Sequence, residues 1–442
     1  MSNRQATFAE CIQSHSGTPL LIHDKKLVYH DTLTAQALSL RANCSGDSSY
    51  SVALQTRDPY QLILGLVAMD GYAKKLLILP PCTPLETTAA LFKQEQITHL
   101  LSQEGLRRIT DENQQSRQDE ATNWLFLTSG TTGDPKILSH TFSGLASKTA
   151  SHVGHATDLR WGLAYQAHRF AGIQVILQAL ISGRPLVLPR SSDAAKMAEA
   201  FVEHKVTALS ATPSQWRQLL SQGQIRQCEL RQITLGGEIA DQAILSALQR
   251  AFPESRIAHI YASTEAGVGF SVSDGLAGFP HKWLNTDRTV RMKQSSRGTL
   301  MLRGSARSNS NAIAAELDPE GYLDTGDSIE IEGERVYFLG RATGVINVGG
   351  NKVHPEEVER LVRALPGIQD ARVTGKKNPI MGQIVALEVE ASEQTSGDIE
   401  TLKKKIRDHC RERLPNYKVP AMISVVPKLP VNDAGKLDRK TA

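Results

Sequence analysis

Cysteine is scarce in this sequence, and no pair of cysteines has the spacing that a zinc site or a disulfide framework requires. The 442 residues contain five cysteines, an odd number, and none forms a Cys-x-x-Cys pair. This pattern is typical of a reducing compartment, so we expect a cytoplasmic protein. The N-terminal residues also lack the apolar segment of a signal peptide. The cysteines are Cys11, Cys44, Cys82, Cys228 and Cys410.

Two features that would indicate a nucleic-acid or membrane partner are also missing. Lys and Arg number 50 against 46 Asp and Glu, and a net charge of +4 is too small to favour either partner. The most apolar stretch, residues 173–188, contains Gln174, Gln178 and Arg184 and is interrupted by Gly-Arg-Pro at 183–185. It predicts a buried helix followed by a strand, and no membrane span.

Strand-like and helix-like segments alternate through the first 340 residues. Such alternation predicts α/β layers with parallel strands, and the chain is long enough for more than one core. We therefore expect a large N-terminal domain over residues 1–340. The expected helices are 59–69, 85–93 and 193–204, and the expected strands are 75–79, 98–102, 124–127, 206–209, 257–260 and 336–339.

The last hundred residues follow a different pattern. Pro355 suits the first position of a helix, and apolar residues at 358, 361, 362 and 365 have helical spacing. A strand at 384–389 precedes a helix at 398–414, in which Ile399, Leu402 and Ile406 share one face, and a strand at 422–426. These segments predict a small, mobile α+β domain over residues 341–442, with a hinge at 341–344.

A hydroxyl-rich loop directly follows the strand at 124–127. It reads Thr-Ser-Gly-Thr-Thr-Gly-Asp-Pro-Lys. The glycines let the backbone bend around an anion, the hydroxyls add donors, and the lysine adds positive charge. No Gly-Lys-Ser/Thr ending is present, so this is not a Walker loop. A flexible turn is the alternative reading. The expected phosphate-binding residues are Thr128, Ser129, Gly130, Thr131, Thr132, Gly133 and Lys136.

Four later segments add polar residues that would each be weak signals alone, because turns and surface loops often contain them. They are Leu235-Gly236-Gly237-Glu238, Tyr261-Ala262-Ser263-Thr264-Glu265-Ala266-Gly267, Asp324-Thr325-Gly326-Asp327 with Gly340-Arg341, and Gly435-Lys436-Leu437-Asp438-Arg439. Together with the loop, and in this order, they resemble the signature motifs of the ANL superfamily of acyl-adenylate-forming enzymes. This family includes acyl-CoA synthetases, nonribosomal adenylation domains and luciferases. The resemblance covers residues from about 20 to 439.

The resemblance implies a nucleotide site for ATP. Residues 236–238 would lie along the adenine, on which Tyr261 would stack. Arg341 and Asp327 would contact the ribose. A carboxylate suits the ribose hydroxyls because it only accepts hydrogen bonds and can take two donors at once.

The resemblance also implies a reaction in two steps. A carboxylic acid would attack the α-phosphorus of ATP to give an acyl-adenylate, and a thiol would then take the acyl group. Thr264 would bind the α-phosphate, Glu265 would coordinate Mg²⁺, and Lys436 would bridge the carboxylate and the α-phosphate. Gly350 would let a pantetheine arm approach the backbone. Thr343 stands at the hinge, where the family usually has Asp or Lys.

The sequence says less about which carboxylic acid is the substrate. The acyl pocket would include His168, Arg169, Gly172, Ser263 and Gly267. Residue type favours His168 for the gating position common in the family, whereas the spacing to Gly172 favours Arg169, and either could meet a polar substituent or have a structural role. We expect a small or medium acid, aryl in preference to long-chain.

Two questions stay open from the sequence. The acceptor is expected to be coenzyme A, with a phosphopantetheinyl acyl carrier protein as the alternative. Lysines at 403–405 and Arg407 could meet an acidic carrier, or could simply form a solvated helix face. A nucleotide-binding module without catalysis is a third hypothesis, which the presence of Glu265, Asp327 and Lys436 disfavours.

Overall fold

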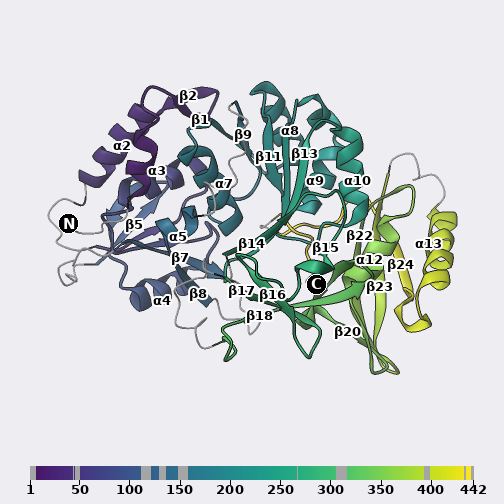
Figure 1. Ribbon diagram of the computed structural model, residues 1–442. Coiled ribbons are helices and arrows are strands. Elements are labelled where there is room, and N and C mark those ends of the chain that lie inside the picture. The colour runs from purple at the N-terminus through teal and green to yellow at the C-terminus, as the bar shows by residue number, and fades with distance from the viewer. Residues whose placement is uncertain are drawn as a thin grey trace.

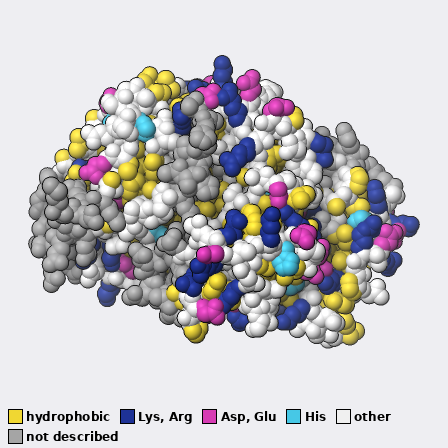
Figure 2. All heavy atoms as spheres, viewed as in Figure 1, with side chains coloured by type: hydrophobic (Ala, Val, Ile, Leu, Met, Phe, Trp, Pro, Cys, Tyr) yellow, Lys and Arg dark blue, Asp and Glu magenta, His cyan; other side chains and the backbone are white. Residues whose placement is uncertain are grey.

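The computed structural model describes residues 6–42, 44, 50–110, 121–128, 136–147, 158–265, 267–304, 316–392, 399–432 and 435–439. Figure 1 shows a large N-terminal part, coloured purple to green, beside a smaller C-terminal part, coloured green to yellow. Blue basic and magenta acidic side chains are intermingled on the face in Figure 2. Within the described ranges, no helix is both long enough and apolar enough to cross a bilayer.

Two largely parallel sheets form the centre of the N-terminal part. In both, the inner strands run parallel and the edge pairs β13/β14, β1/β2, β5/β6 and β7/β8 are antiparallel. The first sheet has the order β14 (Gly267–Val272), β13 (Arg256–Ser263), β12 (Gln232–Gly236), β11 (Ala208–Ala211), β9 (Trp161–Leu163), β10 (Leu186–Leu188), β1 (Pro19–His23), β2 (Lys26–Tyr29). The second has the order β6 (Gly105–Arg108), β5 (His99–Ser102), β3 (Val52–Leu54), β4 (Lys75–Ile78), β7 (Asn123–Thr128), β8 (Lys136–Thr141).

Helices cover these sheets as the apolar patterns require. Helix α3 (Pro59–Met69) is buried over residues 62–69 and shares one core with α7 (Phe170–Ile181) and strands of both sheets. A helix that is apolar all round has to be buried in this way. The expected α/β class is therefore confirmed. The other helices of this part are α1 (Phe8–Gln13), α2 (His30–Ala42), α4 (Leu85–Glu95), α5 (Phe142–Ala146), α8 (Ala194–Glu203), α9 (Pro213–Ser221) and α10 (Gln242–Ala251).

A third sheet adds to the expected α/β layers with parallel strands. It is wholly antiparallel. Short turns join β16 to β17 and β18 to β19, the latter at Gly333, whereas β15 pairs with β19 and β17 with β18 across long connections. Residues 324–327 and 261–263, expected in loops, lie within strands. The sheet has the order β15 (Phe279–Pro280), β19 (Arg335–Arg341), β18 (Leu323–Glu332), β17 (Thr299–Arg303), β16 (Arg291–Gln294).

The C-terminal part has its own sheet and core. Leu402 and Ile406 are buried as expected, but Ile399 is 45% exposed because it lies in the first turn of its helix, at the edge of the core. The short helix η3 (Ala342–Gly344) joins β19 to this part, where the hinge was expected. A domain boundary and rotation at this point stay predictions. The elements are β20 (Ile346–Val348), β21 (Asn351–Val353), α12 (Pro355–Arg363), β22 (Ile368–Asn378), β23 (Gly382–Ala391), α13 (Ile399–Arg413) and β24 (Met422–Val426).

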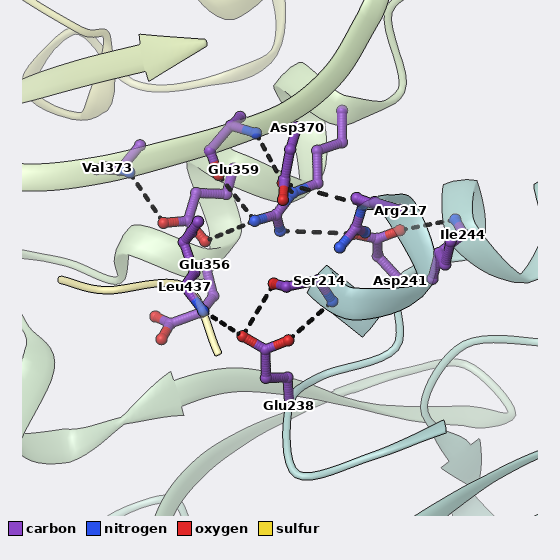
Figure 3. A network of polar contacts seen from close by, with 12 residues as sticks. Ser214, Arg217, Glu238, Asp241, Ile244, Glu356, Glu359, Asp370, Val373 and Leu437 are labelled. Atoms are coloured by element: carbon purple, nitrogen blue, oxygen red, sulfur yellow. Dashed lines mark hydrogen bonds and ion pairs between the residues drawn. The ribbon is translucent and has the colours of Figure 1, made fainter. Parts of the chain in front are cut away.

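Buried charges lie where the two parts meet (Figure 3). Glu359 of α12 has no exposed surface and lies 2.6 Å from Arg439 and 3.3 Å from Arg363. Its other oxygen accepts the backbone N–H of Val373 at 2.9 Å. A buried carboxylate with several donors is a strong anchor, because removing it weakens the compensation of two cations and leaves a buried N–H without its acceptor.

We expect Glu359→Ala to lower the free energy of unfolding by about 3–5 kcal/mol, because Arg363 and Arg439 each lose one carboxylate partner and the buried N–H of Val373 loses its acceptor. Urea denaturation followed by circular dichroism measures this. Glu400→Ala is the matched control, since its ion pair with Lys403 is exposed on the glutamate side, and it should change the value by less than about 1 kcal/mol. Equal effects of the two substitutions would contradict the anchoring role of Glu359.

Candidate active site

A cavity of about 1120 Å³ opens at the carboxyl ends of β11, β12 and β13, where the C-terminal part meets them. This edge of a parallel sheet is the usual place for a ligand in an α/β protein. Side chains from distant parts of the sequence converge here. The predicted site residues that line the cavity are His168, Arg169, Gly236, Gly237, Glu238, Tyr261, Ser263, Thr264, Glu265, Asp327, Arg341 and Lys436.

Asp327 is held from two sides within this cavity. The hydroxyl of Tyr261 donates to Oδ2 of Asp327, and Nε of Arg341 lies 2.8 Å from Oδ1. Burial raises the pKa of Asp327 above its ordinary value, and the charge of Arg341 opposes that shift. The carboxylate is therefore fixed in orientation before any ligand arrives.

The ring of Tyr261 belongs to an aromatic cluster. Phe270 and Phe338 stack on it with ring centroids 5.3 and 5.1 Å away. Burial, followed by the charge of Asp327, raises the pKa of Tyr261 well above its ordinary value, so the hydroxyl remains a donor. The expected stacking of Tyr261 on adenine stays a prediction, and the structure adds a hydrogen bond that the motif did not predict.

Lys436 enters the cavity from the C-terminal part. Burial lowers the pKa of its ammonium group, and the nearby carboxylate of Glu238 opposes this shift. Its stem passes close to Gly237, where a Cβ would lie 3.3 Å from Cε of Lys436 and the backbone has φ of +82°. Glycine is therefore suited to this position both by its conformation and by the space that the lysine occupies.

The segment at Thr264 and Glu265 is held by a residue that sequence reasoning missed. Nε2 of His140 lies 2.9 Å from the carbonyl oxygen of Thr264. Because burial lowers the pKa of His140, its ring is neutral near pH 7 and donates through Nε2–H. His140 lies on β8, the strand that begins at Lys136, so one side chain connects that strand to the predicted metal ligand. No spacing in the sequence indicates this contact.

One part of the cavity lining, called the polar arm below, combines aromatic and polar groups. Phe126 and Phe170 line it beside Gln166 and Arg169. Nε of Arg169 and Oε1 of Gln166 are buried and have no hydrogen-bond partner among the described residues. Buried polar groups are normally paired, so this arm suits a ligand with a polar or anionic group next to a ring.

Several predicted phosphate-binding residues fall outside this description. Residues 129–135 and the side chain of Thr128 lie outside the described part of the chain. Lys136 does not line the cavity, and its ammonium group lies 2.9 Å from Glu316. The phosphate-binding role of residues 128–136 therefore stays a prediction.

Three predicted glycines are not among the cavity-lining residues. Gly350 lies exposed at the tip of the β20–β21 hairpin with φ of +85°. Gly172 packs inside α7, where a Cβ would lie 2.2 Å from the carbonyl oxygen of Gln166. Gly267 begins β14 with φ of +68°. Gly172 thus leaves room for the backbone of Gln166, which lines the cavity, and its place in an acyl pocket stays a prediction, as does the role of Gly350.

Models of two protein families match this chain. A family described as "AMP-binding enzyme" matches residues 33–299, and "AMP-binding enzyme C-terminal domain" matches residues 357–436. The 2-succinylbenzoate–CoA ligase of Bacillus subtilis strain 168 is 28% identical over 343 residues, which are 73% of this chain and 68% of that protein. The ligase of the same name from Staphylococcus aureus strain MSSA476 is 27% identical over 71% of this chain and 65% of its own length.

Solved structures share the fold over nearly the whole chain. An anthranilate CoA ligase, AuaEII, in complex with anthranoyl-AMP has a TM-score of 0.79 at 17% identity, covering 99% of this chain and 96% of its own. The o-succinylbenzoate CoA synthetase of Bacillus subtilis, in complex with its acyl-adenylate, has a TM-score of 0.72 at 21% identity, covering 98% and 97%.

We expect Asp327→Ala to weaken ATP binding by about 1.5–3 kcal/mol, the range for a hydrogen bond to a charged group. Tyr261→Phe is the matched control, because it removes a donor to Asp327 but leaves the carboxylate and Arg341 in place. Apparent ATP affinity from isothermal titration measures both effects. Asp327 is excluded from the nucleotide site if its substitution leaves the affinity unchanged.

Proposed function

The chain belongs to the AMP-binding enzyme family, and on this premise we propose that it joins a carboxylic acid to a thiol at the expense of ATP, releasing pyrophosphate and then AMP. The family expected from the five motifs is therefore confirmed. The observation that carries the proposed reaction is one cavity in which Lys436, from the C-terminal part, meets Glu265 and Asp327 of the N-terminal part.

The first step joins two anions, so charge neutralisation and positioning are its main requirements. A carboxylate oxygen attacks the α-phosphorus, the bond from that phosphorus to the bridging oxygen of pyrophosphate breaks, and an acyl-adenylate remains. No general base is needed, because carboxylic acids are ionised near neutral pH. The buried ammonium group of Lys436 is the described cation best placed to hold the two negative groups together.

Magnesium fits the groups around Glu265. The described residues hold no set of three or more His, Cys, Asp or Glu side chains that could enclose a metal ion. Mg²⁺ commonly takes one or two protein carboxylates and fills its other positions with phosphate oxygens and water. Glu265 would supply that carboxylate at the cavity wall, and the ion would offset the charge of the ATP phosphates.

The acid that we propose is an aromatic keto acid with two carboxylates, 2-succinylbenzoate. The named relatives from Bacillus and Staphylococcus act on this acid, and the described cavity has a matching polar arm. One carboxylate is activated and the other keeps its charge, so it requires a cation. Arg169 supports this choice better than His168, because a guanidinium is charged at every relevant pH.

Coenzyme A is the acceptor that we propose for the second step. The thiol attacks the acyl carbonyl, its proton leaves to solvent, and the bond to AMP breaks. A carrier protein gains little support from α13, where Lys403 and Lys404, two of the four basic residues that could meet it, lie within 3.5 Å of carboxylates on the same helix. Rotation at Thr343, a pantetheine contact at Gly350 and a cytoplasmic location all stay predictions.

We expect ATP–pyrophosphate exchange that depends on both 2-succinylbenzoate and Mg²⁺, with AMP as the final nucleotide product. Release of ADP would indicate a kinase or an ATPase instead, and no exchange with any acid would favour a binding module without catalysis. Lys436→Ala is the reference variant, since losing one preorganised donor to the transition state should lower exchange by about 10²–10³-fold.

We expect Arg169→Met to raise the KM for 2-succinylbenzoate by about 10- to 100-fold, because the unreacted carboxylate loses a charged partner. The KM for 4-oxo-4-phenylbutanoate should change little, because this acid has the succinyl carboxylate but lacks the carboxylate on the ring, which is the one that we assign to Arg169. Arg190→Met is the control, because Arg190 is exposed and pairs with Asp24 away from the cavity. An equal loss with both acids would show that Arg169 does not bind the second carboxylate.

A further inference from the structure

The carboxylate of Glu238 makes a contact that its expected place beside adenine does not explain. Its Oε1 accepts the backbone N–H of Leu437 at 2.8 Å, and Leu437 directly follows Lys436. The N–H and the hydroxyl of Ser214, in the first turn of α9, donate to the two oxygens of the same carboxylate at 2.9 and 3.1 Å. Figure 3 shows Glu238 pointing toward Ser214 and Leu437.

A second contact lies on the other side of the lysine. The hydroxyl of Thr212 donates to the carbonyl oxygen of Gly435 at 2.5 Å, while it accepts the N–H of Gln215 as the cap of α9. Gly435 itself fits tightly, since a Cβ there would lie 2.4 Å from Nε2 of Gln215 and its φ is +69°. The backbone is therefore bonded to the N-terminal part immediately before and immediately after Lys436.

The rest of this segment is held by the C-terminal part and by itself. The N–H groups of Gly435 and Asp438 donate to backbone oxygens of residues 432 and 430. Arg372 donates to the carbonyl oxygen of Asp438 at 2.6 Å, and Arg439 lies 2.6 Å from Glu359. The described residues of the segment are thus bonded to the C-terminal part, and Glu238 and Thr212 bond the segment to the N-terminal part.

We propose that Glu238 and Thr212 form a clamp that positions Lys436 for acyl-adenylate formation. A lysine side chain has four rotatable bonds, and among the described residues no hydrogen bond or ion pair fixes the ammonium group of Lys436, so its reach is set by where its backbone is held. A carboxylate suits the clamp because both oxygens accept, which lets one side chain satisfy α9 and Leu437 together. Glu238 is thereby a positioning residue, and this inference rests on the function proposed above.

Beside the clamp, Arg217, Asp241, Arg363 and Asp370 form a network of charges that is less suited to positioning Lys436. Its contacts across the interface are long, 3.5 Å from Arg363 to Asp241 and 3.9 Å from Arg217 to Asp370. Within each part the corresponding pairs are 2.6 Å for Arg217 and Asp241 and 2.7 Å for Arg363 and Asp370. The network therefore tolerates small shifts between the parts, whereas the clamp makes short bonds to one place in the backbone.

Glu238→Gln tests the clamp with little change in size. An amide has one acceptor oxygen, so it can accept the backbone N–H of Ser214 or that of Leu437 but not both, and its NH2 group faces the other N–H. Amide hydrogen exchange at Leu437 or at Ser214, whichever faces the NH2 group, should become at least tenfold faster, while the amides of Gly435 and Asp438, bonded within the segment, serve as internal controls. This measurement needs no substrate, so it tests the clamp even if the proposed reaction fails.

Kinetics then separate positioning from nucleotide binding. We expect Glu238→Gln to lower kcat for pyrophosphate exchange by about 10- to 100-fold with little change in the KM for ATP. Conversion of supplied acyl-adenylate to thioester should stay near the wild-type rate. Gly435→Ala should give the same result, because the added methyl group would clash with the side chain of Gln215 and displace the backbone next to Lys436. Glu254→Gln, at an exposed loop position, is the matched control for the amide substitution.

Other outcomes would overturn the clamp. A raised KM for ATP with unchanged kcat and unchanged exchange at both Leu437 and Ser214 would make Glu238 an adenine contact, as its motif implies. Equal loss of both half-reactions together with a lower melting temperature would make its role merely structural. Absence of pyrophosphate exchange in the wild-type protein, with the expected change at Leu437 or Ser214 still seen in the variant, would leave the clamp standing and refute the proposed function.

Discussion

Every charge buried where the two parts meet requires a partner, and this requirement organises the interface. Arg217 and Asp241 pair within the N-terminal part, and Arg363 pairs with Asp370 within the C-terminal part. Burial on its own would lower the pKa of Arg363, but its acidic neighbours raise it above the ordinary value. Because each half is compensated by itself, the parts can separate without leaving an unpaired charge on either side, which avoids the large penalty of breaking a buried pair.

This division between self-paired charges and short backbone contacts bears on the two-step reaction. A lysine that covers the reacting carboxylate in the first step obstructs the thiol in the second. In this interface the charges are paired within each part, and a few bonds from Glu238 and Thr212 fix the position of the segment around Lys436. Such an interface can close in one defined position and still open. The lowered pKa of Lys436 also favours an interface that can open, because burying its ammonium group is costly until negative groups lie beside it.

Much of the fold could be predicted because apolar spacing reports burial directly. The helix at 59–69 and the strand at 422–426 have the expected bounds. The antiparallel sheet could not be predicted, since two of its pairings, β15 with β19 and β17 with β18, join strands that are separated by long connections. Motifs likewise indicated that Glu238 and Asp327 belong to the site. They could not show that Glu238 bonds to Leu437 or that His140 supports Thr264, because those contacts exist only after distant strands have come together.

The geometry around Asp327 bears on the ribose-binding role that is predicted for it. A carboxylate offers about four lone-pair positions. Tyr261 and Arg341 occupy one position on each oxygen, which leaves about one on each oxygen for further donors. The two hydroxyls of a ribose would fill that remainder without displacing either protein group. The tyrosine and the arginine therefore orient the carboxylate and limit the number of donors that it can still accept, which favours a ligand with two neighbouring hydroxyls over a single donor.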